Sequence, residues 1–283
     1  MKLIRFGNKG QEKPGVIINE QRKDCSAHFS DWDRAFFQND GLEALQVLVD
    51  KEGATLPDVP TTARWASPIA RPGMIMCVGL NYADHAKESG MDIPTEPLVF
   101  MKASNTISGP FDDVDIPRNS SKTDWEVELG VVLKKDVLYL ADEAAAQDAI
   151  AGYCVINDLS ERAFQLEKGG QWVKGKSCPG FSPVGPYLLT SDELSDVSQL
   201  KMQLSVNGVG KQNGSTSTMI FKPAYTIWYL SQLMLLEAGD LLSTGTPPGV
   251  GLGFDPPQYL TSGDVVELSI EGLGTQRQTY KSA

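Results

Sequence analysis

From residue 74 onward the chain consists largely of short apolar runs, each bounded by Gly, Pro or Asp. The runs lie at residues 74–80, 98–101, 127–133, 152–157, 185–190, 202–206, 241–243 and 264–270. Segments of this length are typical of strands, because a core helix needs a longer periodic stretch. The pattern therefore predicts a β-rich α+β fold, with a barrel-like or stacked-sheet body.

Helical signals are fewer and lie in three places. Residues 141–150 follow a candidate N-cap at Asp142, and residues 224–236 follow Pro223 and end before a glycine. Apolar residues also recur at helical spacing over residues 40–52. Because a proline-containing linker follows that segment, we expect a small N-terminal α/β domain (residues 1–65) and a larger domain (residues 66–283).

Charge and composition exclude several classes of partner. The formal net charge is -11, so the chain should repel nucleic acid and anionic membrane surfaces. No apolar run has the length of a membrane-spanning helix or of a signal-peptide core, and we expect a cytoplasmic protein. The four cysteines are scattered and the only histidines are His28 and His85, which argues against a Cys/His zinc site.

The segment of residues 124–132 has the period-two alternation of a strand. Trp125, Val127 and Leu129 share one face, so Glu126 and Glu128 share the other. Two carboxylates about 7 Å apart along a strand repel each other unless a cation or base lies between them. The same pattern also fits an ordinary strand with a solvated polar face.

A third carboxylate follows another apolar run. Asp158 comes after the run of residues 152–156, at the predicted end of a buried strand. Three carboxylates without Cys or His suit a hard cation such as Mg²⁺, Mn²⁺ or Ca²⁺. Taken alone, Asp158 would be read as a turn or cap residue.

A candidate acid–base pair follows the run at 74–80. His85 and Glu88 lie three residues apart and would share one face of a short helix. A carboxylate beside an imidazole can orient it and raise its basicity. A histidine with a purely structural role is the alternative at this position.

Residues 244–253 form a glycine-rich turn that could present backbone amides to an anion. The turn lacks the Lys and Ser/Thr of a phosphate-binding loop and does not match a dinucleotide fingerprint. A tight connection between strands is an equally good interpretation. The chain also has no Gly-x-Ser-x-Gly motif, so the metal hypothesis is stronger than serine catalysis.

Together and in this order, these motifs resemble those of the fumarylacetoacetate hydrolase family. The matching segments are residues 78–85, 100–102, 124–130, 157–165, 174–177 and 243–251. The resemblance spans roughly residues 68–280. It implies a β-rich fold of wrapped mixed sheets, forming a roll or barrel, and a homodimer.

The resemblance also implies the roles of individual residues. Glu126, Glu128 and Asp158 would bind Mg²⁺ or Mn²⁺, and His85 would act as the base toward water. In short-chain members the partner of this histidine is the residue matched by Glu88. The other implied site residues are Gln165 and Lys176 for catalysis, and Lys102 and Thr246 for substrate binding.

One position departs from the family pattern. The family's usual Arg-Asp before Gln is replaced by Arg162-Ala163-Phe164-Gln165, which puts in doubt any role of the missing Asp. Residues 161–165 and 169–172 also resemble bacterial hydrolases of 2,4-diketo-3-deoxy sugar acids. Proteins with this pattern often carry the label ureidoglycolate lyase.

The implied activity is that of a hydrolase acting on carbon–carbon bonds in ketonic substances. Its small anionic keto-acid substrate would be a 2,4-diketo acid, either an acylpyruvate or a diketo sugar acid. Cleavage between C3 and C4 would yield pyruvate and a carboxylic acid. An isomerase or decarboxylase of related acids, a ureidoglycolate lyase and a keto-acid-binding sensor are the alternatives.

Overall fold

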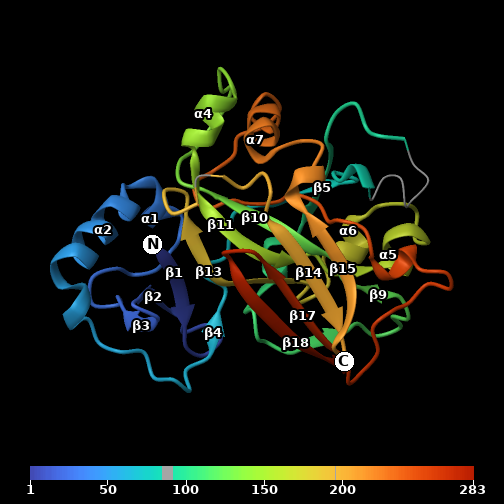
Figure 1. The fold of residues 1–283 in the computed structure, drawn as a ribbon, viewed down its shortest axis with the longest axis horizontal. Coiled ribbons are helices and arrows are strands. Elements are labelled where there is room, and N and C mark those ends of the chain that lie inside the picture. Colours follow the sequence, from blue (N-terminus) through green and yellow to red (C-terminus); the bar gives the residue numbers. More distant parts are fainter. Residues whose placement is uncertain (85–91, 195) are drawn as a thin grey trace.

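The computed structural model describes residues 1–84, 92–194 and 196–283, which form two large sheets and peripheral helices (Figure 1). The larger sheet has the strand order β3-β2-β1-β13-β11-β10-β16-β5-β6, with β4 paired to β1 and β7 paired to β13. Its strands are β1 (Lys2–Phe6), β2 (Lys13–Ile18), β3 (Gln21–Asp24), β4 (Trp65–Ala66), β5 (Ile75–Gly79), β6 (Leu98–Lys102), β7 (Ile107–Ser108), β10 (Val127–Leu133), β11 (Ile150–Asn157), β13 (Ser182–Thr190) and β16 (Leu241–Ser243).

A second sheet has the strand order β15-β14-β17-β18-β8, and β9 and β12 form a separate pair. These strands are β8 (Val114–Ile116), β9 (Thr123–Asp124), β12 (Ser160–Glu161), β14 (Lys201–Val206), β15 (Val209–Ser215), β17 (Val265–Ile270) and β18 (Gly274–Ser282). Most neighbours are antiparallel, but the pairs β5–β16, β7–β13 and β8–β18 are parallel. The β-rich α+β prediction with mixed sheets is confirmed. The barrel alternative is wrong, because the sheets pack as layers and do not close.

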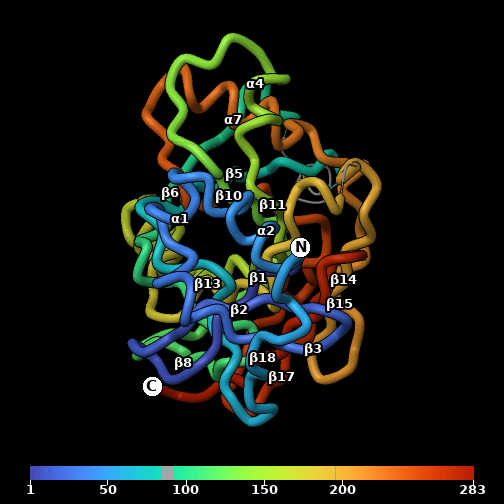
Figure 2. Tube along the Cα trace, turned by 90° about the vertical axis from the view of Figure 1, so that its left-hand side faces the viewer, coloured from blue at the N-terminus to red at the C-terminus, as the bar shows by residue number. Residues whose placement is uncertain are grey.

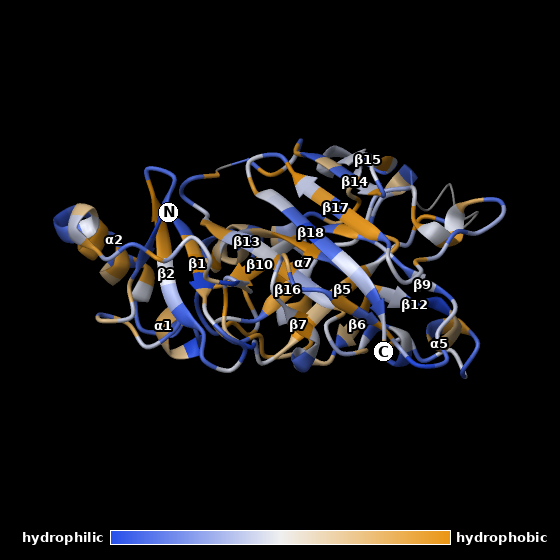
Figure 3. Cartoon of the chain, turned by 90° about the horizontal axis from the view of Figure 1, so that it is seen from below, coloured by the Kyte–Doolittle hydropathy of each residue, from blue (hydrophilic) through white to orange (hydrophobic). Residues whose placement is uncertain are grey.

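The main core lies between the two sheets, whose strands overlap in Figure 1. Val127, Leu129 and Val131 of β10 enter this core together with apolar residues of β14 and β17. Val132 of β10 joins a second core on the opposite face of the larger sheet. Because both faces of β10 are covered, its whole length is buried. Figure 3 colours the strands by hydropathy, and the core strand β17 is apolar there.

The helices lie outside the sheets. Within the described ranges they are α1 (Arg34–Gln38), α2 (Gly41–Glu52), α4 (Glu143–Asp148), α5 (Arg162–Leu166), α6 (Val173–Lys176) and α7 (Pro223–Ser231), with short 3-10 turns η1 (Gly53–Thr55), η2 (Ser104–Thr106), η3 (Thr216–Thr218) and η4 (Gly251–Gly253). As predicted, Asp142 caps α4, accepting a hydrogen bond from the amide of Ala145. The helix predicted to reach residue 236 ends at Ser231, because Leu236 pairs with Val137 in a β-bridge instead.

The N-terminal strands continue the larger sheet. β1 pairs with β13 through Lys2 and Leu3, and α1 and α2 contribute to the second core (Figure 2). The division of the chain at residue 65 remains a prediction. Within the described residues, no helix combines the length and the apolar character needed to cross a bilayer.

Candidate metal centre

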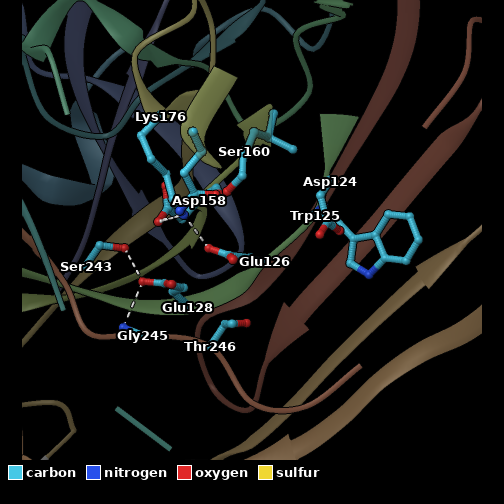
Figure 4. Close-up of polar contacts among 12 residues, drawn as sticks. Asp124, Trp125, Glu126, Glu128, Asp158, Ser160, Lys176, Ser243, Gly245 and Thr246 are labelled. Atoms are coloured by element: carbon cyan, nitrogen blue, oxygen red, sulfur yellow. Dashed lines mark hydrogen bonds and ion pairs between the residues drawn. The ribbon is translucent and has the colours of Figure 1, made fainter. Parts of the chain in front are cut away.

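Three buried carboxylates meet where β10 begins and β11 ends. The two strands are antiparallel, with Val127 opposite Asn157, so Glu126 and Glu128 lie beside the residue that follows β11, Asp158. The backbone amide of Asp158 donates to the carbonyl of Glu126 at 2.9 Å, which fixes the junction. One ligand oxygen of each carboxylate lies within 4.8 Å of the others (Figure 4). The structure thus brings together all three predicted metal ligands.

Basic side chains compensate two of these carboxylates. The ammonium of Lys176 donates to Glu126 and to Asp158, each at 2.6 Å. Arg162 donates from Nη2 to the other oxygen of Glu126 at 2.6 Å. Lys102 donates to the other oxygen of Asp158 at 2.5 Å. Burial alone would raise the pKa of Glu126, but Lys176 and Arg162 lower it to about 2.

Glu128 has a different environment. It accepts hydrogen bonds from the hydroxyl of Ser243 at 2.5 Å and from the amide of Gly245 at 2.8 Å. Burial, followed by repulsion from Asp158 and Glu126, raises the pKa of Glu128 to about 8. The glycine-rich turn therefore presents an amide to a carboxyl group of the chain itself.

The donor set fits a hard divalent cation. A fourth buried carboxylate, that of Asp124, belongs to the same cluster as Glu126, Glu128 and Asp158. It pairs with Arg162 at 2.8 Å. Among the described residues, three buried basic groups face these four carboxylates, those of Lys102, Arg162 and Lys176. The described part of the cluster therefore carries one uncompensated negative charge when all groups are ionised, and its donors are all oxygen atoms. A Mg²⁺-like or Mn²⁺-like ion would offset this charge.

The carboxylates lie at a cavity of about 400 Å³. Gln165, Lys176 and Thr246 line it, as the predicted roles require. Lys102 does not line it, because its ammonium donates to Asp158 and to the carbonyls of Leu159 and Phe181. In this structure Lys102 therefore holds Asp158 in place and makes no direct contact with the cavity.

Most of the chain matches a known protein family. Residues 74–281 match the fumarylacetoacetate (FAA) hydrolase C-terminal family. The chain belongs to the fumarylacetoacetate hydrolase family. A protein of Burkholderia multivorans, provisionally described as a hydrolase, is 50% identical, with both chains covered completely.

Solved structures of similar proteins include both hydrolases and isomerases. Fumarylacetoacetate hydrolase from Exiguobacterium antarcticum is 33% identical, with a TM-score of 0.85 and full coverage of both chains. A 5-carboxymethyl-2-hydroxymuconate delta-isomerase from Mycobacterium smegmatis is 28% identical, with a TM-score of 0.79 over 100% of this chain and 99% of that one. Maleylpyruvate hydrolase from Sphingobium sp. SYK-6, solved with manganese(II) and pyruvate, is 24% identical with a TM-score of 0.83 over both full chains, and shows the fold alone. The family is one of enzymes.

Two groups of this centre were not predicted from the sequence. Arg162 binds Glu126, and through Nη1 it also donates to Gln165 at 3.0 Å. Its signal was its place three residues before Gln165, which puts both side chains on one face of α5. Asp124 accepts from Arg162 and from the amides of Gly251 and Leu252. Nothing in the local pattern distinguished Asp124 from a solvated strand residue.

The predicted acid–base pair, His85 and Glu88, lies outside the described residues. The preceding strand β5 ends at Gly79, and both Gly79 and Leu80 line the cavity. The chain therefore leaves β5 at the edge of the site before it reaches His85.

Proposed function

We propose that this protein is a metal-dependent hydrolase that cleaves the C3–C4 bond of a 2,4-diketo acid, producing pyruvate and a second carboxylic acid. The observation that carries the proposal is the buried carboxylate triad, Glu126, Glu128 and Asp158, at a cavity that also contains Lys176 and Arg162. Negative and positive groups are thus held side by side in a buried site, where an anionic keto acid could be bound and its charge redistributed.

Glu126, Glu128 and Asp158 would hold Mg²⁺ or Mn²⁺. When bound, such an ion would act as a Lewis acid toward the oxygen atoms of the keto acid. The maleylpyruvate hydrolase that shares this fold was solved with manganese(II) and pyruvate, so the fold accommodates such a pair. The three buried carboxylates lie close enough together to offer their oxygen atoms to one cation in this chain, which supports such an ion at the same place.

The chain's own residues would bind and polarise the substrate. Lys176 and Arg162 bring positive charge to the cavity of a protein whose net charge is -11, and so offset repulsion of the substrate anion. Lys176 and Gln165 would stabilise the oxyanion formed at C4, and Thr246 would contact the substrate carboxylate. His85, oriented by Glu88, would take the proton of the attacking water, a role worth about 10²–10⁴-fold in rate.

Isomerisation of a related 2-hydroxydienoate is the second candidate, because a similar solved protein is an isomerase. It needs proton transfer and no attacking water. Decarboxylation and the ureidoglycolate lyase reaction would use the same carboxylates. A keto-acid sensor would bind its ligand without consuming it.

A product assay separates these possibilities. Metal-stripped protein would be incubated with acylpyruvates, a diketo sugar acid, oxaloacetate, ureidoglycolate and a 2-hydroxydienoate, each with Mg²⁺, Mn²⁺ or chelator alone. We expect equal amounts of pyruvate and a carboxylic acid from a 2,4-diketo acid, and only when metal is added. Full turnover with chelator, an isomerised product, or binding without any product would each contradict the proposal.

A further inference from the structure

The cavity has a polar floor and an apolar mouth. The charged groups that line it are buried, including Glu126, Asp158 and Lys176. In contrast, the apolar lining residues Leu166 and Leu252 are 47% and 39% exposed. A bound keto acid would therefore place its carboxylate and oxo groups at the floor and the remainder of its chain in the mouth.

An aromatic pair forms part of this mouth. The rings of Phe100 and Trp172 meet edge to face, with centroids 5.2 Å apart. The ammonium of Lys176 lies 5.1 Å from the centroid of Phe100. Trp172 precedes α6, and its carbonyl accepts from the amide of Lys176 at 3.1 Å. One helical turn therefore connects the aromatic wall to the polar floor.

Gly79 provides the space for Trp172. A Cβ atom at position 79 would lie 2.8 Å from Cζ3 of the Trp172 ring, closer than real Cβ contacts allow. The backbone of Gly79 is in an extended strand, so glycine is required here by the approach of the ring and not by the backbone angles. The indole is thus packed directly on the end of β5.

Leu252 is fixed to the floor by Asp124. The amides of Gly251 and Leu252 donate to Asp124 at 2.6 and 3.0 Å, and Arg162 donates to the same carboxylate at 2.8 Å. Asp124 thereby connects Leu252 at the mouth with Arg162, which binds Glu126. A mouth built in this way is preorganised, which favours a tail of matching chemistry.

We propose that this mouth, which we call the apolar clamp (Phe100, Leu166, Trp172 and Leu252), selects substrates with an uncharged, apolar acyl tail. The inference rests on the proposed function and narrows its substrate to acylpyruvates that lack hydroxyl or carboxylate groups in the tail. Among the described residues of the clamp, the indole N–H of Trp172 is the one polar side-chain group, and none of the four side chains is cationic. The ammonium of Lys176 is already paired with Glu126 and Asp158, so a tail hydroxyl or carboxylate in the clamp would lose more contacts with water than it regains. The cavity is within the size range of small-molecule sites, so it has room for more than pyruvate.

Binding of 2-oxo acids tests the clamp without requiring turnover. Calorimetric titration of the Mn²⁺-loaded protein would compare pyruvate, 2-oxopentanoate and 2-oxohexanoate. Affinity should rise about fourfold for each added methylene, since burying one is worth about 0.8 kcal/mol. At equal chain length, 2-oxohexanedioate and 5,6-dihydroxy-2-oxohexanoate should bind about tenfold or more weakly than 2-oxohexanoate. Equal or tighter binding of either polar analogue would overturn the clamp.

A variant pair assigns the effect to Trp172. Trp172→Ala should weaken 2-oxohexanoate binding about tenfold and change pyruvate binding by less than about twofold, because only the longer tail reaches the indole. Val173→Ala is the matched control, because Val173 is the next residue, is exposed, and does not line the cavity. If Trp172→Ala weakens both ligands equally, or neither, the clamp assignment is wrong.

The outcomes separate this inference from the proposed function. Tail-dependent binding without cleavage of any acylpyruvate would leave the clamp standing and contradict the hydrolase. Cleavage of acylpyruvates, with a binding affinity that does not depend on tail length, would support the hydrolase and contradict the clamp. Failure of every 2-oxo acid to bind would overturn both.

Discussion

The ammonium of Lys176 lies between Glu126 and Asp158, 2.6 Å from an oxygen of each. Removing this charge leaves the two carboxylates buried, with Arg162 and Lys102 as their remaining cationic partners among the described residues. Breaking such a buried pair costs about 3–5 kcal/mol. A divalent ion at the same carboxylates would offset part of that loss.

We therefore predict that Lys176→Met destabilises the metal-free protein by about 3–5 kcal/mol and that Mn²⁺ stabilises the variant more than the wild type. Urea unfolding of both proteins, with Mn²⁺ and with chelator, measures this difference. The same substitution at an exposed position of α6, Lys174→Met, serves as the control. An equal loss of stability with and without metal would contradict the prediction.

At the residue scale, the sequence predicted the acidic ligands better than their partners. Period-two alternation placed Glu126 and Glu128 on one face, but alternation carries no information on burial, and a solvated face fitted equally well. Their burial comes instead from distant segments, because α5 and α6 contact Glu126 and β16 contacts Glu128. Lys176 and Arg162 reach Glu126 from 50 and 36 residues away, a tertiary contact that no local pattern encodes.

At the element scale, the pairing of β11 with β13 depends on a glycine. Gly152 lies opposite Thr190, and a Cβ atom at position 152 would lie 2.2 Å from the carbonyl oxygen of Leu189. The obstacle is backbone, so a side chain can be accommodated only if the two strands move apart. Gly210, in the strand β15 at the end of the other sheet, would have no atom within 4 Å of its Cβ.

Gly152→Ala should therefore destabilise the protein by about 2 kcal/mol or more, because the substitution overpacks a central strand pair. Gly210→Ala should change the free energy of unfolding by less than about 1 kcal/mol, because the added Cβ would meet no other atom. The φ angles of Gly152 and Gly210 both permit alanine, so backbone strain does not distinguish the two substitutions. Denaturant unfolding of the two variants gives the comparison. A similar effect of both substitutions would show that the close approach at Gly152 does not limit the fold.

The apolar runs of the sequence predicted strands such as β10, β11 and β17 closely, because these strands bury apolar side chains. The strand β18 was not predicted, since it is largely polar (Figure 3). Its buried residues include Gln276 and Gln278, whose amides donate to backbone carbonyls, Gln276 to that of Val155 at 2.7 Å and Gln278 to that of Pro110 at 2.6 Å. Hydrogen bonding replaces apolar burial there, so hydropathy gave no signal.

At the scale of the whole molecule, one ion pair ties the end of the predicted N-terminal domain to the larger one. Arg64 donates to both oxygens of Asp112, each at 2.6 Å. Burial alone would raise the pKa of Asp112, but the hydrogen bonds from Arg64 and from the Gly109 amide hold it below its usual value. A lowered folded-state pKa means that the pair stabilises the protein fully above the unfolded-state pKa and loses its contribution as the pH falls through the folded-state value.

Asp112→Asn should accordingly cost about 1–3 kcal/mol at pH 7, and the difference from wild type should shrink as the pH falls below about 4. Asp113→Asn is the control, because Asp113 pairs with Lys281 at the surface and should contribute little. Urea unfolding across this pH range tests the prediction. A difference that stays constant with pH would contradict it.

The homodimer and the cytoplasmic location also belong to this scale and remain predictions. Neither follows from the fold of one chain, because a subunit contact depends on the surface of two copies and a location depends on the cell. By contrast, the fold of one chain accounts for the layered sheets and for the meeting of the three carboxylates, which come from segments far apart in the sequence.

Titration of metal-stripped protein with Mn²⁺, followed by electron paramagnetic resonance and calorimetry, tests the central claim most directly. The wild type should bind one Mn²⁺ per chain. Glu128→Gln and Asp158→Asn should each weaken binding at least about tenfold, whereas Glu267→Gln, at an exposed position of β17, should leave it unchanged. Identical affinity and stoichiometry in all four proteins would contradict a metal centre formed by Glu126, Glu128 and Asp158.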